Sequence, residues 1–285
     1  MNLIIGAVVV LVCVLGGFMI HGGHLLAIWQ PSELLIIGGA AAGGFLIANP
    51  MGVVKKSLGS VSSLLKGAKY TKGHYLELFG LMFALFNIAR REGVIGLERE
   101  IEDPEKSAVF GKFPLIQHDH HAMEFIQDYL RMMVSGDMNP LQVENLMDVE
   151  LDTHHHEAEN MSGAISRIAD ALPGFGIVAA VLGIVNTMGA LGGPVEEIGE
   201  KVAAALVGTF LGILLAYGFI SPMATAIEHR SKDEAAFFTT IKTCIIAMLQ
   251  GYSPQIAVEF GRKATSSNMR PSFKDLEDLL RGKKE

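Results

Sequence analysis

Four long apolar stretches constrain the fold of this chain more than any other feature of its sequence. A helix that crosses a bilayer needs about 20 mostly apolar residues. The stretches that approach this length are Leu3–Ile20, Leu34–Ala48, Gly174–Leu191 and Val202–Phe219. Half of the residues are hydrophobic and only 19% are charged, which is too apolar for an ordinary soluble chain of 285 residues. The sequence therefore predicts an all-α, polytopic membrane protein with four transmembrane helices.

The distribution of Lys and Arg predicts the orientation. Of the 23 basic residues, 12 lie between Asn49 and Leu172, ten follow Phe219, one is Lys201, and none precedes the second stretch. Cytoplasmic loops carry the excess of Lys and Arg, so we expect both termini in the cytoplasm. The predicted domains are a transmembrane hairpin over residues 1–48, a cytoplasmic helical domain over 49–172, a second hairpin over 173–222, and a cytoplasmic helix and tail over 223–285.

The large loop between the second and third stretches is predicted to be helical, because no strand-like alternation interrupts it and turn residues divide it. Its apolar run Leu76–Ala89 has 14 residues, too few for a fifth span. We expect this run to pack against a helix around residues 123–133 and against a tail helix that carries Ile241 and Ile245.

Histidines and cysteines are weak candidates for a metal site or a disulfide. His118 and His121 have helical spacing, but two ligands do not make a zinc site, and the consecutive His154, His155 and His156 fan around a helix. Cys13 and Cys244 fall on different parts of the topology. We expect no cofactor and no nucleic-acid partner, and no nucleotide loop, nucleophile elbow or metalloprotease signature supports an enzyme.

Small residues form a stripe along each of the last two apolar stretches. The first stripe has the spacing i, i+4, i+7 and i+11, and the two stripes are Gly176, Ala180, Gly183 and Thr187, and Ala205, Gly208, Thr209, Gly212 and Ala216. Small residues let helices approach closely in lipid, so helix packing is one interpretation. The other is that the stripes face a third helix, with the two threonines near a passing ion unless their hydroxyls bond the carbonyl at i−4.

Charged residues are missing from the predicted spans, since Glu33 and the group at 196–201 lie at their ends. Ion relays through membranes use buried ionisable groups. If this chain moves ions, we therefore expect another chain to supply the carboxylate.

Two prolines lie at the predicted cytoplasmic boundary of the last two spans. Pro173 fits the first turn of a helix, where its missing N–H costs nothing. Pro222 is expected to kink a helix that continues past it. Two prolines at one depth predict a hinge between the membrane and the cytoplasmic domain.

These features resemble the flagellar motor stator branch of the MotA/TolQ/ExbB proton-channel family. The resemblance covers essentially the whole chain and rests on the four-span arrangement and on the segments NIARREGVIGLE, ALPGFGIVAAVLGIVNTMG and LVGTFLGILLAYGFISP. It implies an inner-membrane, homo-oligomeric ring around a dimer of MotB, whose helices bring a proton-binding aspartate to the stripes. Proton flow through this complex would drive flagellar rotation and motility.

The resemblance also implies roles for individual residues. Contact with the rotor protein FliG falls on Arg90 and Glu98, with Arg91 and Glu100 as neighbours. The hinge falls on Pro173 and Pro222. Sodium-driven relatives carry threonine where Ala180 stands, which favours protons. The residues expected to line the ion path are Thr209, Ala180, Gly176, Gly183, Thr187 and Gly212.

Three alternatives remain open from the sequence. A TolQ or ExbB type subunit would use the same mechanism in another machine, but those relatives have three spans and an outside N-terminus. A passive membrane scaffold would not need paired prolines and matched stripes. An enzyme that uses the histidine clusters would lose activity with a chelator.

Overall fold

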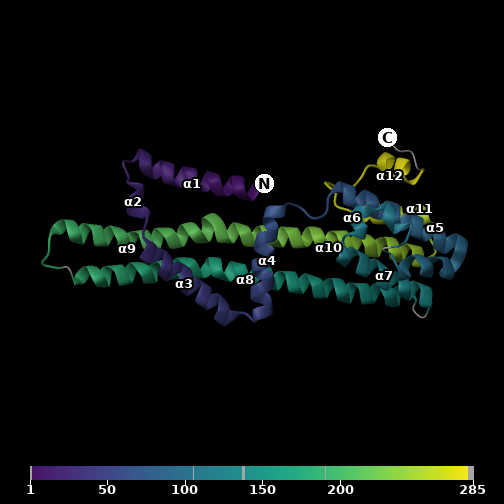
Figure 1. Ribbon diagram of the computed structural model, residues 1–285, viewed down its shortest axis with the longest axis horizontal. Helices are drawn as coiled ribbons and strands as arrows, with labels where there is room; N and C mark the ends of the chain where they lie inside the picture. The colour runs from purple at the N-terminus through teal and green to yellow at the C-terminus, as the bar shows by residue number, and fades with distance from the viewer. Residues whose placement is uncertain (1, 105, 137–138, 190, 282–285) are drawn as a thin grey trace. The chain divides into compact units, whose positions relative to one another are not determined.

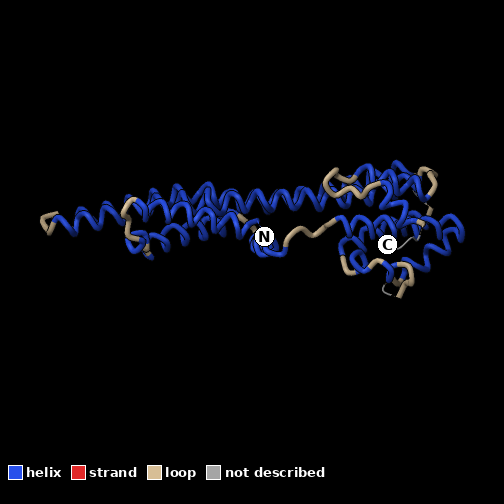
Figure 2. Tube along the Cα trace, turned by 90° about the horizontal axis from the view of Figure 1, so that it is seen from above, coloured by secondary structure: helices blue, strands red, loops and turns tan. Residues whose placement is uncertain are grey.

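The computed structural model describes residues 2–104, 106–136, 139–189 and 191–281 (Figure 1). Figure 2 shows helices joined by loops, with no strand in these ranges. The all-α prediction is therefore confirmed. The elements are α1 (Asn2–Ile20), α2 (Leu25–Ile28), α3 (Pro31–Ala48), α4 (Met51–Ser63), η1 (Leu64–Lys66), α5 (Lys72–Glu102), η2 (Phe110–Lys112), α6 (Pro114–Gln117), α7 (His120–Ser135), α8 (Pro140–Met188), α9 (Val195–Leu215), η3 (Ala216–Ile220), α10 (Ser221–Leu249), α11 (Pro254–Ala264) and α12 (Phe273–Leu280).

The described residues form two compact units. The first unit contains the chain up to Gly67 together with Glu157–Arg230, and the second contains Ala68–His156 and the chain from Ser231 onward. The predicted domains were divided at the expected membrane boundary. The contacts divide the chain after η1 at Gly67 and inside α8 and α10, at Glu157 and Arg230.

Within the described ranges, four helical segments are long and apolar enough to cross a membrane. They lie in Leu3–Ile20, Leu25–Ala48, Pro140–Met188 and Val195–Leu249. The second segment begins earlier than the predicted Leu34 and includes Glu33, which stands in the first turn of α3. The third belongs to one helix that starts at Pro140, so the interpretation of Pro173 as a helix-starting residue is wrong.

The first unit is held together by packing among α3, α8 and α9. Its core contains Ile37 and Ala41 of α3, Leu172 and Ala179 of α8, and Leu211 of α9. In contrast, α1 keeps its apolar side chains exposed; Val12, for example, is 64% exposed. Such an all-round apolar helix is suited to contact lipid.

The second unit has a conventional hydrophobic core. Leu76–Ala89 lies in α5 and buries Leu78, Phe79, Met82 and Phe86 completely. These side chains cluster with Met123, Ile126 and Leu130 of α7 and with Ile241 and Ile245 of α10. The prediction that this run is a core helix packed on those two helices is confirmed, and α11 joins the same cluster through Ala257 and Val258.

Candidate functional site

The small-residue stripes of α8 and α9 lie against each other. A methyl group added to Gly176 would come within 3.0 Å of the Gly208 carbonyl oxygen and 3.2 Å of the Gly212 Cα. One added to Gly183 would come within 2.7 Å of the Ala205 Cβ. Contacts this short leave no room for a side chain, so these glycines set the distance between the two backbones. The helix-packing interpretation therefore accounts for Gly176, Gly183 and Gly212 within this chain.

Glu33 reaches this helix contact from α3. Its side chain is buried (6% exposed), and a methyl group added to Gly208 would lie 2.7 Å from Glu33 Oε2. The same methyl group would lie 3.4 Å from the backbone nitrogen of Ala180. Among the described residues, no hydrogen-bond donor reaches Glu33 Oε2. Glu33, expected at the end of the second span, thus stands in the first turn of α3 within the candidate span Leu25–Ala48, and its side chain is buried.

The two threonines of the stripes differ in their hydrogen bonding. The Thr187 hydroxyl is buried and donates to the Gly183 carbonyl oxygen at 2.8 Å. This is the back-bond to residue i−4 that often satisfies a hydroxyl in an apolar helix. The half-buried Thr209 makes no side-chain hydrogen bond within the described ranges. Its hydroxyl is the one that remains available to an ion or to another chain.

The prolines interrupt the two long helices in different ways. Pro173 lies inside α8, where its ring removes the hydrogen bond to the Ala169 carbonyl. Pro222 follows the π-helical turn Ala216–Ile220, where the Ser221 N–H donates to the Ala216 carbonyl oxygen five residues earlier. A proline kink in a continuing helix was expected at Pro222, and the π-helical turn before it is the local irregularity that the structure shows.

Contacts along the two helices place the prolines at different levels. The Leu172 carbonyl oxygen, next to Pro173, faces Gly212, whereas Ala224, two residues after Pro222, belongs to a buried cluster with Ile165. Ten residues separate Gly212 from Pro222, or about 15 Å of helix at about 1.5 Å per residue. The two prolines are therefore not opposite each other across the helix pair, and the expectation of one common depth does not hold along this contact.

A second candidate surface surrounds Gly93 in the second unit. Gly93 interrupts α5 with a φ of 71°, a left-handed conformation that glycine adopts at little cost. Arg90 and Arg91 precede this kink and Glu98 follows it, and all three are exposed. None of the three forms an ion pair with another described residue. Their charges are therefore available to a partner.

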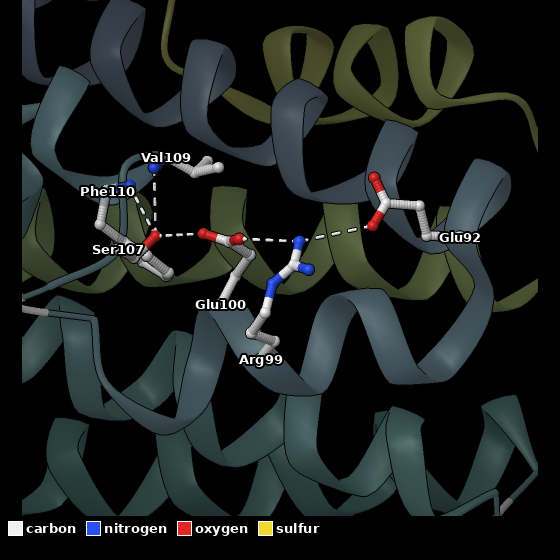
Figure 3. Close-up of polar contacts among 6 residues, drawn as sticks. All are labelled: Glu92, Arg99, Glu100, Ser107, Val109 and Phe110. Carbon is white, nitrogen blue, oxygen red and sulfur yellow. Dashed lines mark hydrogen bonds and ion pairs between the residues drawn. The ribbon is translucent and has the colours of Figure 1, made fainter.

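Glu100 differs from this group because it is held inside the protein (Figure 3). Its side chain is 12% exposed, and its Oε2 accepts a hydrogen bond from the Ser107 hydroxyl at 2.5 Å. Ser107 in turn accepts hydrogen bonds from the backbone N–H groups of Val109 and Phe110. Arg99 bridges Glu100 and Glu92 at 3.4 Å each, a link that the sequence analysis did not include. Glu100 thus stabilises the turn after α5.

Asp119 accounts for the polar character of the first histidine cluster without a metal. It caps α7 by accepting from Ala122 N–H at 3.3 Å, accepts from the Tyr70 hydroxyl at 2.8 Å and pairs with Lys69 at 3.1 Å. Burial raises the pKa of Asp119, but the Tyr70 hydrogen bond and the Lys69 charge outweigh burial and hold this pKa below its usual value. Within the described ranges, no group of three or more His, Cys, Asp or Glu side chains is placed to hold a metal ion.

Comparison with known proteins gives two family matches. "Motility protein A N-terminal" matches residues 4–93, and "MotA/TolQ/ExbB proton channel family" matches residues 117–240. Motility protein A of Salmonella typhimurium is 44% identical over 99% of this chain and 95% of its own length. Motility protein A of Escherichia coli is 44% identical over 100% and 96%. The chemotaxis protein LafT of Vibrio parahaemolyticus is 40% identical over 98% of both chains.

Solved structures share the fold. A chain in the structure of C. jejuni MotAB superposes with a TM-score of 0.79 at 19% identity, covering 95% of this chain and 98% of that one. A chain of the flagellar MotAB stator complex from Bacillus subtilis gives 0.71 at 23% identity, covering 90% and 92%. At these identities the likeness establishes the fold alone.

Proposed function

Because the chain belongs to the motility protein A family, we propose that it is a stator subunit of the bacterial flagellar motor that conducts protons together with MotB. The observation that carries this proposal is 44% identity to motility protein A along essentially the full length of both chains. A partial match could reflect a shared membrane module, whereas a full-length match includes the second unit and its charged surface. The function is coupling of ion flow to flagellar rotation, and the family is not one of enzymes.

Partnership with MotB follows from the charges in the spans. Apart from Glu33, the apolar parts of the four candidate spans, which are residues 3–20, 25–48, 172–188 and 202–220, contain no acidic or basic side chain. A proton-conducting membrane complex uses buried ionisable groups. We infer that MotB supplies an aspartate near Thr209 and Ala180, and that several copies of this chain form a ring around the MotB helices. The exposed apolar side chains of α8, such as Val178 and Val185, suit such a partner or lipid.

Within this complex, Thr209 is the polar group of the ion path, since its hydroxyl has no partner in the described chain. Ala180 lies at the same helix contact and carries no hydroxyl group. It therefore offers no side-chain oxygen to replace the water that a hydrated metal cation would lose on binding. We therefore propose protons as the transported ion. Gly176, Gly183, Gly212 and Thr187 support the path by setting the spacing of α8 and α9.

Contact with the rotor protein FliG is proposed for Arg90, Arg91 and Glu98. These charges are exposed, have no ion-pair partner in the described part of the chain, and lie on both sides of the kink at Gly93 in α5. Such surfaces steer reversible association. Glu100 contributes to this surface indirectly, by holding the turn that follows. Pro173 and Pro222 each lack a backbone N–H, so α8 and α10 each lack a backbone hydrogen bond at these positions. We propose that the two helices bend there when the partner's aspartate is protonated.

The membrane topology of the proposal is multi-pass in the bacterial inner membrane with both termini in the cytoplasm. It rests on the Lys and Arg counts, which favour a cytoplasmic location for the second unit. An accessibility test with a cysteine introduced at Glu285 would report the side of the C-terminus.

Complementation tests the function directly. The chain is expressed with MotB in a bacterium that lacks its own motility protein A, and swarming is measured. We expect motility only when both proteins are present. Cells that grow but do not swarm, although both proteins are present at normal membrane levels, would contradict the proposal.

Two variant sets test the assigned roles. Pro173→Ala and Pro222→Ala should each impair swarming at normal membrane levels, and normal motility of both would refute the hinge. Charge reversal at Arg90 should be partly rescued by an opposite reversal on FliG, and failure of every pairing would argue against direct electrostatics.

A further inference from the structure

Glu33 is an acidic side chain that the proposed function does not yet use. It stands in the first turn of α3, within the candidate span Leu25–Ala48, and only 6% of its surface is exposed. Its Oε2 atom has no hydrogen-bond donor among the described residues. A charged carboxylate with a buried oxygen that lacks a donor costs several kcal/mol, and protonation removes this cost.

The carboxyl group of Glu33 lies at the contact between the small residues of α8 and α9. Gly208 leaves the space that Oε2 occupies, since a methyl group there would lie 2.7 Å from this atom. Ala179 and Ala180 bound the same space from α8, at 3.1 Å and 3.4 Å from that methyl position. Gly208 precedes Thr209, the polar residue of the proposed ion path. A larger residue at 208 would exclude the carboxyl group.

Among the described residues of α3, α8 and α9, no other charge is placed to pair with Glu33. The helices packed around it contribute Ile28, Ile37, Phe175 and Val207 to the same apolar cluster. On α3 there is no further ionisable residue, and α8 has none from Leu172 to Met188. On α9 the charged residues are confined to its first seven positions, where Lys201 pairs with Glu197 at 3.0 Å. Gly208 lies about 10 Å further along the helix at about 1.5 Å per residue.

A proton is the neutralising species that fits this site. A hard metal cation takes about six or more oxygen ligands, and the described neighbours offer methyl groups and helical backbone. Protonation needs one oxygen atom only. We infer that Glu33 is a proton-binding residue that this chain itself contributes to the ion path, an inference that rests on the proposed function for its place in transport.

The step balances without another reactant. Hydronium gives its proton to Glu33 Oε2 and leaves water, which converts the carboxylate to a neutral carboxylic acid. When the acid passes the proton to the carboxylate of the partner, the O–H bond of Glu33 breaks and its carboxylate returns. Glu33 is thus a station for a proton, in addition to the aspartate proposed for MotB.

Infrared difference spectroscopy tests protonation directly. The full chain is purified with MotB in nanodiscs in sodium-free buffer, and spectra are compared between acidic and alkaline conditions. We expect a carbonyl-stretch band of a buried protonated carboxyl that is lost in Glu33→Gln and shifted in Glu33→Asp. Glu200→Gln, which changes an exposed carboxyl of α9, should leave the band unchanged. A band that persists unchanged in assembled Glu33→Gln overturns the inference, and if that variant does not assemble, an unshifted band in Glu33→Asp does so.

Proton uptake by liposomes that contain the complex, under an imposed membrane potential, gives the second readout. Glu33→Gln should lower the rate by roughly tenfold or more, as expected for loss of an intramembrane ionisable group, and Glu200→Gln should not. Uptake by Glu33→Gln at the wild-type rate overturns the inference and leaves the proposed function intact. If the wild-type complex transports no protons but shows the Glu33 band, the proposed function fails and proton binding by Glu33 stands.

Discussion

Gly176 and Gly212 face each other so closely that a methyl group added to Gly212 would lie 3.0 Å from the Gly176 Cα. The same methyl group would lie 2.7 Å from the Leu172 carbonyl oxygen, next to Pro173. Backbone atoms cannot move aside as a flexible side chain can. The small residues of both helices are therefore required for α8 and α9 to pair, and the pairing in turn places Glu33, Ala180 and Thr209 at one contact.

Gly212→Val should separate α8 from α9. Overpacking costs about 1–3 kcal/mol in a well-packed core, and the cost is expected at the upper end here because backbone atoms are overlapped. Thermal unfolding of the complex in detergent and swarming both measure the effect. Gly199→Val makes the same change in α9 at a site with nothing within 4 Å of the added Cβ. Equal stability of the two variants would show that the close approach is not required.

The two threonines should respond differently to valine. Thr187→Val removes a local back-bond and should keep proton uptake within about twofold of wild type. Thr209→Val removes the hydroxyl without a described partner and should lower uptake by about fivefold or more if it hydrogen-bonds the ion path. A larger loss in Thr187→Val than in Thr209→Val would reverse the assignment of the polar group.

Substitutions of Glu98 and Glu100 should have different effects, the first on contact with a partner and the second on the stability of the turn after α5. Glu100→Gln weakens a hydrogen bond to a charged group, for which a loss of about 1.5–3 kcal/mol is typical, and should expose the turn from Ser107 to Phe110 to protease. Glu98→Gln should leave protection unchanged and act only on motility. Protease protection of purified protein and swarming are compared for both. Increased cleavage in Glu98→Gln alone would contradict this division.

Asp119 should make the second unit sensitive to acid. Its pKa in the folded protein lies below the value of about 3.9 for an unfolded chain, so the folded state binds the proton less readily. The stabilisation is therefore complete above about pH 4 and is lost as pH falls towards the folded pKa. Melting temperatures of wild type and Asp119→Asn should converge in this range. A constant difference down to pH 2 would show that Asp119 does not titrate as described.

Cys244 and Gly261 should behave as a coupled pair. Cys244 is fully buried, which raises the pKa of its thiol to about 12 and suppresses reaction with thiol reagents. A methyl group on Gly261 would overlap the Cys244 sulfur, so Gly261→Ala should destabilise the second unit by about 1–3 kcal/mol and increase labelling of Cys244. The double variant with Cys244→Ala should recover stability, measured as a double-mutant cycle. Additive losses would show that the two residues are not in contact.

The sequence by itself determined the features that depend on local composition and periodicity. Apolar length predicts four spans, and the 14-residue run Leu76–Ala89, which is too short to cross a bilayer, lies in the core of the second unit as expected. Spacing placed Gly176, Gly183 and Thr187 on one face, and the family segments around Arg90, Pro173 and Thr209 indicated a stator protein. These signals are readable because neighbours on a helix are set by a fixed period.

Only the tertiary structure decided which groups meet across elements. It brought Glu33 of α3 to Gly208 of α9, separated the levels of Pro173 and Pro222, and turned Glu100 inward to Ser107. Each outcome depends on which helices pack together or on the path of the loop after α5. The periodicity of a single helix contains no information about either. These pairings determine which side chains are buried and which find hydrogen-bond partners. For this reason the sequence places Glu33 at the end of a span, whereas the structure shows it as the one buried carboxyl at the contact of α3, α8 and α9 within the described residues.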